Sequence, residues 1–494
     1  MTARTRTART ARTRTARTAR PSPRRVRRAL GAASVLTAVL LATACTAPGE
    51  ETVDVVIGYQ SRTINTVTAG TLLRERGFFE KALEELGGGG VRYRVTWQDY
   101  DTGAPITAQM LAEKVDLGSM GDFPLVVNAS TTRPHERART ALIAVTAYSI
   151  DGGLNGIVVP ASSDADGIED LRGASISTST GSAGDGLLSR VLRGAGLAES
   201  DVTRVNQAPS VGASALTAGS VDAVSQFTSW PGLMVHDGGA RLLVDGAATR
   251  APTFHGVVVR SAFAEERPEV VDAFLSAMIE ATGFLHADPL RASTIVAEET
   301  GLPVEVVHLY NGANGIATFD PTLKQPLLDA LAEDAEYLDA SGVPVDFDAG
   351  SFADDSALRA AWGDGYDAAA ESLENPAVQL VRDEDCPVTE WAAATASEAW
   401  PAGEEQTVFH ATPECLLAAL ASSPLPPRAA YVPDHSTGTR WFADRSEWVH
   451  VPGAEAGHRL LPFATRSAAQ EFLDAEPGGE SLTYGEAVDR ARAL

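Results

Sequence analysis

The sequence lacks the short motifs by which many enzymes are identified. Residues 1–375 contain no GxSxG, HExxH or CxxC pattern and no His and carboxylate arrangement that marks a catalytic site. The five His in this stretch are scattered: His135, His236, His255, His286 and His308. We therefore expect solvated or structural roles for them, and a protein that is not an enzyme.

The hydrophobic run near the N-terminus is short. Residues 29–41 form an apolar run of 13 residues, whereas a membrane-spanning helix needs about 20. RRVRR at 24–28 precedes the run and ATAC at 42–45 follows it, which resembles a bacterial lipoprotein signal with Ala42 in place of the usual Leu. The resemblance implies that residues 1–44 are a basic extension and signal peptide, that Cys45 carries lipid, and that residues 45–52 tether an extracytoplasmic protein to the cell membrane.

Basic residues are scarce beyond the first 28 positions. These 28 residues hold 11 Arg in a degenerate Thr-Ala-Arg repeat, which is either a disordered extension or an upstream misreading of the start codon, above all at residues 1–20. Of the 40 Lys and Arg, 29 remain to face 65 Asp and Glu, a net charge of −36. Because such a surface repels nucleic acid and anionic lipid, we expect no nucleic-acid partner.

Strand and helix patterns alternate in the first part of the mature chain. Residues 53–60 and 91–97 read as strands, residues 68–86 and 106–113 as helices, and residue 115 begins a short strand that enters another helix. This alternation predicts an α/β fold with a largely parallel sheet.

Residues 176–188 (ISTSTGSAGDGLL) read as a strand, a Ser/Thr/Gly turn and a helix that begins near Ser182 or Ala183. Free backbone N–H groups at a helix N-terminus favour an anion. No Lys follows the turn, so it is not a nucleotide-binding GxxxxGK[ST] loop. The alternative is an ordinary capped helix after a strand.

A family resemblance rests on many short motifs in order. IGYQ at 57–60, GFFEK at 77–81, VDLG at 115–118, GDFP at 121–124, DLRG at 170–173 and ALTAGSVDA at 215–223 resemble the substrate-binding proteins of ABC importers, in the nitrate/sulfonate/taurine branch. The resemblance implies a two-lobed periplasmic-binding-protein-like fold (type II) at 53–373 and an ABC permease as partner. Lobe 1 would combine 53–148 with 255–373, and lobe 2 would be 153–246.

In this reading four loops at strand ends converge on the crevice between the lobes. They offer hydroxyls, amides, one carboxylate and aromatic faces, which suit a small anion or zwitterion such as a sulfonate, taurine or a nitrate-like ion. The predicted ligand-binding residues are Tyr59, Gln60, Ser61, Ser119, Met120, Gly121, Asp122, Thr180, Gly181, Ser182, Gln226 and Trp230.

Structural roles remain open for several of these residues. Asp122 either contacts the ligand or caps the helix that starts at Phe123 or Pro124. Trp230 is alternatively a core residue, and Tyr59 and Gln60 alternatively end a buried strand. Arg62 is the one basic residue beside these loops, so anion binding would rest mainly on neutral donors.

The composition shifts after Leu373, where four of the seven Trp and two of the three Cys remain. Residues 385–492, with CPV at 386–388, ECLLAAL at 414–420, WFAD at 441–444 and LPFATRSAAQEF at 461–472, resemble the NosL-like accessory lipoproteins of nitrous oxide reductase maturation. The resemblance implies a small α+β domain that binds copper(I). The family's second Cys and its Met are absent from the first motif, so Cys386, Cys415 and His410 either hold copper or leave the two Cys to form a disulfide.

We therefore expect a lipid-anchored solute-binding component of an ABC importer that closes its lobes on a small organic anion or zwitterion. No cofactor is certain, and copper in the C-terminal domain is the one candidate. The alternatives are a copper-handling lipoprotein and an enzyme of the thiamine-precursor type on the same fold.

Overall fold

The computed structural model describes residues 51–87, 91–377, 382, 386, 388, 392 and 394–493. Several predicted features lie outside the described residues. They are the signal peptide, Cys45 with its expected lipid, most of the tether, and Pro387 of the CPV motif at 386–388.

Lobe 1 is built on a five-stranded sheet with the order β2-β1-β3-β10-β4. β1 pairs in parallel with β2 and β3, and β10 is antiparallel to both of its neighbours. The strands are β1 (Glu51–Tyr59), β2 (Val91–Asp99), β3 (Leu117–Gly121), β4 (Thr140–Ser149) and β10 (Thr253–Arg260). A single antiparallel strand among parallel ones accords with the expected, largely parallel sheet.

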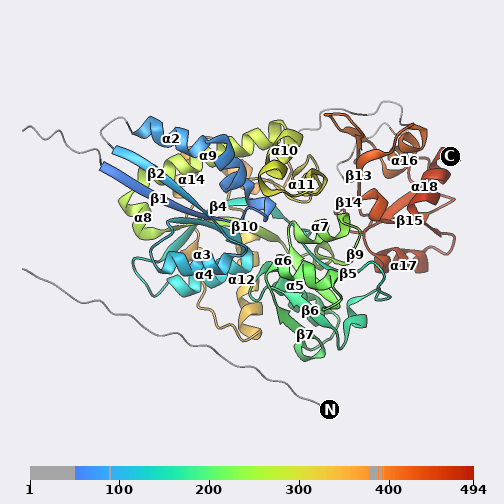
Figure 1. Cartoon of the computed structure of the whole chain (residues 1–494), viewed down its shortest axis with the longest axis horizontal. Helices are drawn as coiled ribbons and strands as arrows, with labels where there is room; N and C mark the ends of the chain where they lie inside the picture. Colours follow the sequence, from blue (N-terminus) through green and yellow to red (C-terminus); the bar gives the residue numbers. More distant parts are fainter. Residues whose placement is uncertain are drawn as a thin grey trace, which may run out of the picture. The chain divides into compact units, whose positions relative to one another are not determined.

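Helices cover both faces of this sheet (Figure 1). One layer includes α2 (Phe78–Leu86), α9 (Pro268–Ala287) and α14 (Ser356–Trp362); the other includes α3 (Gly103–Leu111), α4 (Asp122–Thr132) and α12 (Gln325–Ala340). The remaining helices of the lobe are α1 (Thr71–Arg76), α8 (Ser261–Glu266), α10 (Pro289–Thr300), α11 (Val304–Asn311), α13 (Ala349–Phe352) and α15 (Tyr366–Glu371).

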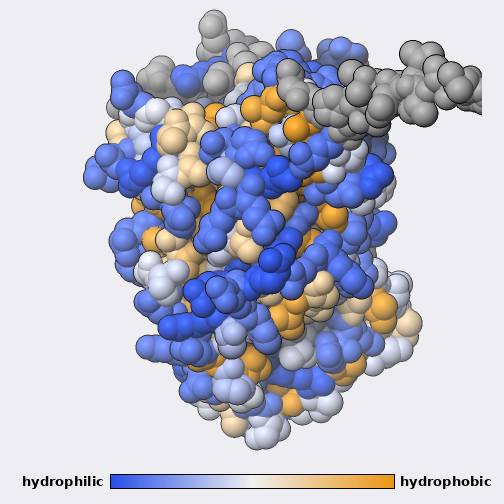
Figure 2. Space-filling view, turned by 90° about the vertical axis from the view of Figure 1, so that its left-hand side faces the viewer, coloured by the Kyte–Doolittle hydropathy of each residue, from blue (hydrophilic) through white to orange (hydrophobic). Residues whose placement is uncertain are grey.

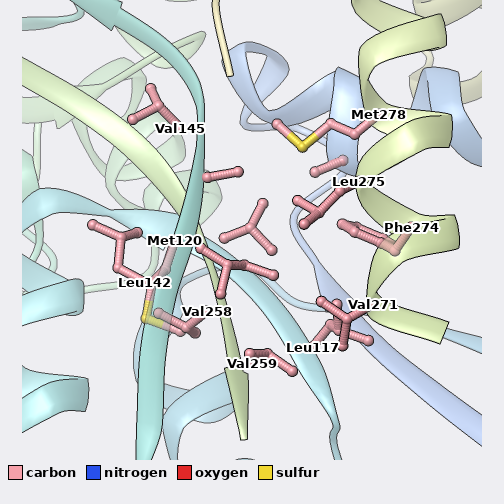
Figure 3. Close-up of a cluster of buried hydrophobic side chains, with 14 of the residues drawn as sticks. Leu117, Met120, Leu142, Val145, Val258, Val259, Val271, Phe274, Leu275 and Met278 are labelled. Atoms are coloured by element: carbon pink, nitrogen blue, oxygen red, sulfur yellow. The ribbon is translucent and has the colours of Figure 1, made fainter. Parts of the chain in front are cut away.

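The core of lobe 1 lies between the sheet and α9. Figure 3 shows Val271, Phe274, Leu275 and Met278 of α9 facing apolar side chains of β3, β4 and β10. α9 is long and apolar enough to cross a membrane, but 56% of its apolar window is buried inside the protein. We therefore interpret α9 as a core helix.

Lobe 2 repeats the architecture with the strand order β7-β6-β8-β5-β9, in which β5 is the antiparallel strand. Its strands are β5 (Asn155–Pro160), β6 (Ser175–Thr178), β7 (Thr203–Asn206), β8 (Ala223–Phe227) and β9 (Ala240–Asp245), and its helices are α5 (Ala183–Gly194), α6 (Pro209–Thr217) and α7 (Trp230–His236). The chain enters lobe 2 between β4 and β5 and leaves it between β9 and β10. These two crossings form the hinge region, residues 150–154 and 246–252.

The C-terminal module, residues 394–493, is a small α+β unit with a four-stranded sheet (β12-β11-β13-β14) and a three-stranded sheet (β16-β15-β17). Its elements are β11 (Ser397–Pro401), β12 (Val408–His410), α16 (Pro413–Ser422), β13 (Pro427–Pro433), β14 (Arg440–Phe442), β15 (Glu447–His450), β16 (Leu460–Phe463), α17 (Arg466–Ala475), β17 (Glu480–Leu482) and α18 (Tyr484–Ala493). The two-lobed α/β fold followed by a small α+β unit confirms the predicted fold class.

One sequence-based expectation is wrong in detail. The helix predicted at 68–86 is three pieces: a 3-10 helix, η1 (Ile64–Ala69), then α1 and α2. Gly77 has φ +65° between α1 and α2, and this left-handed conformation, which glycine adopts readily, ends α1.

One face of the molecule, over lobe 1, is shown in Figure 2. Charged and polar residues dominate this face, and hydrophobic residues are scattered among them in small groups (Figure 2). Scattered apolar residues are normal on soluble proteins, so this face gives no sign of a large docking patch.

Candidate functional site

The four predicted loops follow strands that are neighbours in their sheets. β1 and β3 pair in lobe 1, and β6 and β8 pair in lobe 2, each pair in parallel. Parallel neighbours end at the same edge of a sheet, where ligands of open α/β folds bind. Each lobe therefore presents one edge with two of the four loops.

In lobe 1 the loop residues are held by hydrogen bonds within that lobe. The Gln60 side-chain amide donates to the Ser119 carbonyl oxygen at 3.1 Å. The Asn65 amide on η1 lies 2.7 Å from His255 Nδ1 on β10. An amide N–H that donates to Nδ1 makes His255 an Nε2-protonated neutral imidazole.

Burial reinforces the neutral form of His255. The side chain is buried, and the desolvation lowers its pKa to about 3. The ring lies against the Cα of Gly121, where an added Cβ would come within 3.1 Å of Nε2. His255 is therefore an uncharged hydrogen-bonding group at the edge of the lobe 1 sheet.

In lobe 2 the stretch at 176–188 forms a capped helix, and its predicted start is confirmed. Ser182 is the N-cap of α5, and its hydroxyl accepts from the Asp185 amide. The Asp185 carboxylate accepts from the Gly181 amide at 2.9 Å and pairs with Arg204. An internal carboxylate thus occupies part of the predicted anion cradle, in line with the capped-helix alternative.

The lobes touch each other around these loops. The Ser229 hydroxyl of lobe 2 donates to the Arg62 carbonyl oxygen of lobe 1 at 3.1 Å, and the Arg62 guanidinium lies 5.8 Å from the centre of the Trp230 ring. The Phe227 and His255 ring centres are 6.5 Å apart. We call this boundary, formed by residues 60–66 and 226–232, the seam.

A buried ion pair also crosses between the lobes. Arg190 on α5 lies 2.6 Å from Asp334 on α12, and both line a cavity of about 20 Å³ with Asp122. Such a space holds about one water molecule. The two lobes are therefore in direct contact, and we call this arrangement closed.

Asp122 is tied into lobe 1 by hydrogen bonds. It is the first residue of α4, with Gly121 at the N-cap position. Its carboxylate accepts from the Thr253 hydroxyl at 2.6 Å and from the Phe123 amide at 2.8 Å. Burial raises its pKa, although these hydrogen bonds and Arg190 act the other way. The contacts favour a structural role, which joins α4 to the start of β10.

Other predicted residues are also engaged in structural contacts. The Tyr59 hydroxyl accepts from Arg74, and its ring packs on Trp97. Ser61 donates to Asp99 through both its amide and its hydroxyl. Met120 and Trp230 are buried. Thr180 is exposed, and its amide donates to the Asn206 side chain.

Four buried side-chain oxygens on η1, β3, β6 and β8 have no hydrogen-bond partner within the described residues. They are Asn65 Oδ1 and Ser119 Oγ in lobe 1, and Thr178 Oγ1 and Gln226 Oε1 in lobe 2. An unsatisfied buried polar group costs about 1–3 kcal/mol, and natural proteins retain few of them. We call these four atoms the orphan set; two of its residues, Ser119 and Gln226, are among the predicted site residues.

Asn65, Thr178 and His255 were not among the predicted site residues. Thr178 lies within the Ser/Thr turn, and its position at a strand end could have indicated it. Asn65 and His255 are 190 positions apart, and no local pattern connects them. Only the pairing of β10 with β3 brings His255 beside Gly121.

In the C-terminal module, Cys386 and Cys415 form a disulfide, with their Cα atoms 5.6 Å apart. His410 is buried at the end of β12. Among the described residues, no group of three or more His, Cys, Asp or Glu is placed to hold a metal ion.

Comparison with known proteins gives relatives for the two-lobed part. Residues 107–292 match the family model described as NMT1/THI5 like. The taurine-binding periplasmic protein of Escherichia coli (strain K12) is 28% identical over 260 residues, which are 50% of this chain and 78% of the relative. A Bacillus subtilis (strain 168) protein whose name gives aliphatic sulfonates as its ligands is 24% identical over 266 residues, 54% of this chain and 76% of the relative.

Among solved structures, the alkanesulfonate-binding protein SsuA from Xanthomonas axonopodis pv. citri, bound to MOPS, is 23% identical with a TM-score of 0.51, over 60% of this chain and 96% of that one. At this identity the likeness concerns the fold alone. The two-lobed part of the chain is therefore similar in sequence to sulfonate- and taurine-binding proteins and has the fold of a periplasmic binding protein.

Proposed function

We propose that this protein is the extracytoplasmic, lipid-anchored solute-binding component of an ABC importer, and that it captures a small sulfonate-type anion or zwitterion by closure of its lobes. The observation that carries the proposal is the orphan set, four unsatisfied oxygens on η1 and on strands of both sheets. A ligand between the lobes would supply the missing partners, and closure would then remove it from water.

The chemistry of the orphan set favours a zwitterion. The amide oxygens of Asn65 and Gln226 only accept hydrogen bonds, which suits an ammonium group, while the hydroxyls of Ser119 and Thr178 can donate to an oxyanion. His255 adds a neutral Nε2–H donor. Taurine-like molecules combine both kinds of group, and a bare anion such as nitrate uses only the donors.

The two relatives described above are binding proteins by name, which supports capture of a ligand without a reaction. The side-chain hydrogen-bond partner of His255 is the Asn65 amide. It is not a carboxylate that could orient the ring as a catalytic base. The enzyme alternative is thus the weaker one.

Titration calorimetry on Ser119→Ala tests the proposal. Because Ser119 Oγ has no internal partner, its removal should not lower the unfolding temperature of the ligand-free protein and should raise it slightly, while the affinity for taurine or ethanesulfonate falls about tenfold. Ser293→Ala is the matched control, since Ser293 is buried on α10 and donates to the Pro289 carbonyl at 2.7 Å; it should lower stability and spare affinity. Equal affinities of Ser119→Ala and the unsubstituted protein across taurine, ethanesulfonate and nitrate would contradict the proposed site.

For the C-terminal module we propose a NosL-like origin, with copper(I) as its candidate ligand. Copper(I) prefers thiolate donors, and the Cys386–Cys415 disulfide leaves neither sulfur as a thiolate. Copper(I) titration should therefore show binding only after reduction of the disulfide. Tight binding to the oxidised protein would show a copper site that does not use these thiolates.

A further inference from the structure

The C-terminal module contacts both lobes and both hinge crossings. This arrangement is independent of any ligand, so a role of the module in lobe movement does not rest on the proposed function. The contacts fall into three sets, to the α11 region of lobe 1, to the hinge, and to lobe 2.

The contacts with the α11 region are buried and charged. Glu398 on β11 lies 3.0 Å from His308 Nε2 on α11 through one oxygen, and its other oxygen pairs with Arg440 on β14. Arg440 also donates to the Ala313 carbonyl. All three side chains are almost completely buried. Burial alone would raise the pKa of Glu398, but Arg440 and His308 outweigh it and lower the pKa to about 2.

Two further bonds hold the module to α11. The Tyr431 hydroxyl donates to the Glu305 carbonyl at 2.9 Å, and Arg428 lies 2.6 Å from the Glu305 carboxylate. Glu398 and Arg440 both belong to the module, and separation from α11 would take His308 and the Ala313 carbonyl away from these buried charged groups, which is costly. The module is therefore firmly attached to α11.

α11 in turn belongs to lobe 1. The Asn311 amide donates to the Ile64 carbonyl of η1 at 2.9 Å, and the Thr318 amide, just after α11, donates to the Tyr148 carbonyl of β4 at 2.8 Å. A movement of lobe 1 would carry α11 and the module with it.

The loop at 434–439 rests on the hinge. Arg250 of the second crossing donates to the Ser436 carbonyl at 3.3 Å. Thr439 Oγ1 lies 3.4 Å from the position that a Cβ would take on Gly153, in the first crossing. A rotation about the hinge must displace this loop from at least one crossing.

The polar contacts with lobe 2 are fewer in the described chain, and the one ion pair among them is exposed. The Thr437 hydroxyl lies 2.8 Å from Oδ2 of Asp245, which is buried at the end of β9. His236 of α7 packs on Phe442 with ring centres 5.7 Å apart, and Arg466 lies 3.6 Å from the exposed Asp166. Exposed ion pairs contribute little, so the contacts of Thr437 and Thr439 with the buried Asp245 are the strongest polar contacts of this set.

We propose that the C-terminal module is a brace that moves with lobe 1 and latches lobe 2 in the closed arrangement through the Thr437–Asp245 hydrogen bond. The module's contacts with α11 are stronger than its contacts with lobe 2, which indicates that the module moves with lobe 1. When the lobes separate, the weaker lobe 2 set breaks and the buried set at α11 holds. The module thereby shifts the balance between open and closed lobes toward closure.

Hydrogen–deuterium exchange on the full exported chain without ligand tests the brace, with Thr437→Val as the variant. Loss of a hydrogen bond to a carboxylate should raise the open population about tenfold. Exchange should then accelerate by a similar factor at the seam, including the Gly232 amide, which donates to the Tyr310 hydroxyl of α11 at 3.1 Å. Exchange within β15 and β16 of the module should stay unchanged.

Thr465→Val is the matched control, since Thr465 caps α17 in the same module by accepting from the Ala468 amide. It should accelerate exchange in α17 and not at the seam. Unchanged seam exchange in Thr437→Val, or equal acceleration in both variants, would overturn the brace. Thr437 also lies within hydrogen-bond distance of Asp434 and Thr439, so Thr437→Val could unfold the module. In that case Asp245→Ala removes the same hydrogen bond from the lobe 2 side, and faster exchange at the seam is again the expected result.

Discussion

At the scale of single residues, the two lobe edges combine satisfied and unsatisfied polar groups. Gln60 and Asp122 make hydrogen bonds that hold their loops, whereas Ser119 Oγ and Gln226 Oε1 make none within the described residues. A residue type alone indicates that a side chain can bind a ligand. Whether its atoms are already engaged depends on neighbours that are distant in the sequence.

His255 gives a prediction about pH. The folded protein keeps His255 neutral down to a pKa of about 3, whereas the ordinary value is 6.5. Unfolding therefore takes up a proton between these two values, and stability should fall by about 1.4 kcal/mol for each pH unit below 6.5. Denaturant unfolding between pH 4 and pH 7 should show a slope smaller by this amount in His255→Gln, while His286 and His435, whose pKa values burial also lowers, contribute in both proteins. Asp122, whose pKa is raised, gives a slope of opposite sign, but it is present in both proteins.

His135→Gln is the control for this experiment because His135 is exposed. It should keep the slope of the unsubstituted protein. If the slopes of His255→Gln and the unsubstituted protein are the same, then His255 is not held neutral in the folded state.

At the scale of elements, α5 is one of the helices of lobe 2 that face lobe 1. A Cβ on Gly186 would come within 2.1 Å of the Phe123 ring on α4, and one on Gly184 within 2.7 Å of the Gln226 backbone. The small residues in GSAGDG thus permit α5 to approach both its own sheet and the opposite lobe. The glycine-rich turn serves close packing in addition to helix capping.

Gly186→Ala should disturb closure. The added methyl group must displace Phe123 or separate the lobes, and overpacking of this kind costs about 1–3 kcal/mol. We expect a lower affinity for sulfonates and faster exchange at the seam. Gly194→Ala on the same helix is the control, because a Cβ there meets nothing within 4 Å and alanine favours the helix by up to about 1 kcal/mol. If both variants bind and exchange alike, α5 does not set the approach of the lobes.

At the scale of the whole molecule, the C-terminal module has its own hydrophobic core and a disulfide. The Cys386–Cys415 bridge spans 29 positions. In the chain-entropy model a loop of this length stabilises the folded state by about 3–4 kcal/mol. The bridge therefore gives a module of this small size an important part of its stability.

Replacement of both Cys386 and Cys415 by Ser should lower the stability of the module by about this amount. Intrinsic fluorescence would follow the change, since Trp400, Trp441 and Trp448 are buried in the module. Reductant should shift the unfolding of the unsubstituted protein in the same direction and leave the Ser variant unaffected. A Ser variant as stable as the oxidised protein would show that the bridge adds little.

Much of the fold follows from local sequence patterns. The alternation of strands and helices, the end of β1 at Tyr59 and the start of α5 after Ser182 are set by spacing, capping and turn residues that act over a few positions. These signals also indicate which loops lie at the carboxyl ends of strands. The break at Gly77 was missed because a glycine within a helical pattern does not by itself reveal its φ.

The sequence by itself determined the alternation of strands and helices and the strand ends that carry the candidate loops, because these depend on short-range periodicity and on the regular geometry of parallel sheets. The two lobes and the small α+β unit after them were implied by the family resemblances. Only the tertiary structure decided that Asn65 faces His255, that Asp185 rather than a ligand satisfies the Gly181 amide, and that the loop at 434–439 rests on the hinge. These outcomes depend on contacts between residues far apart along the chain or on side-chain orientation, and no local pattern encodes either.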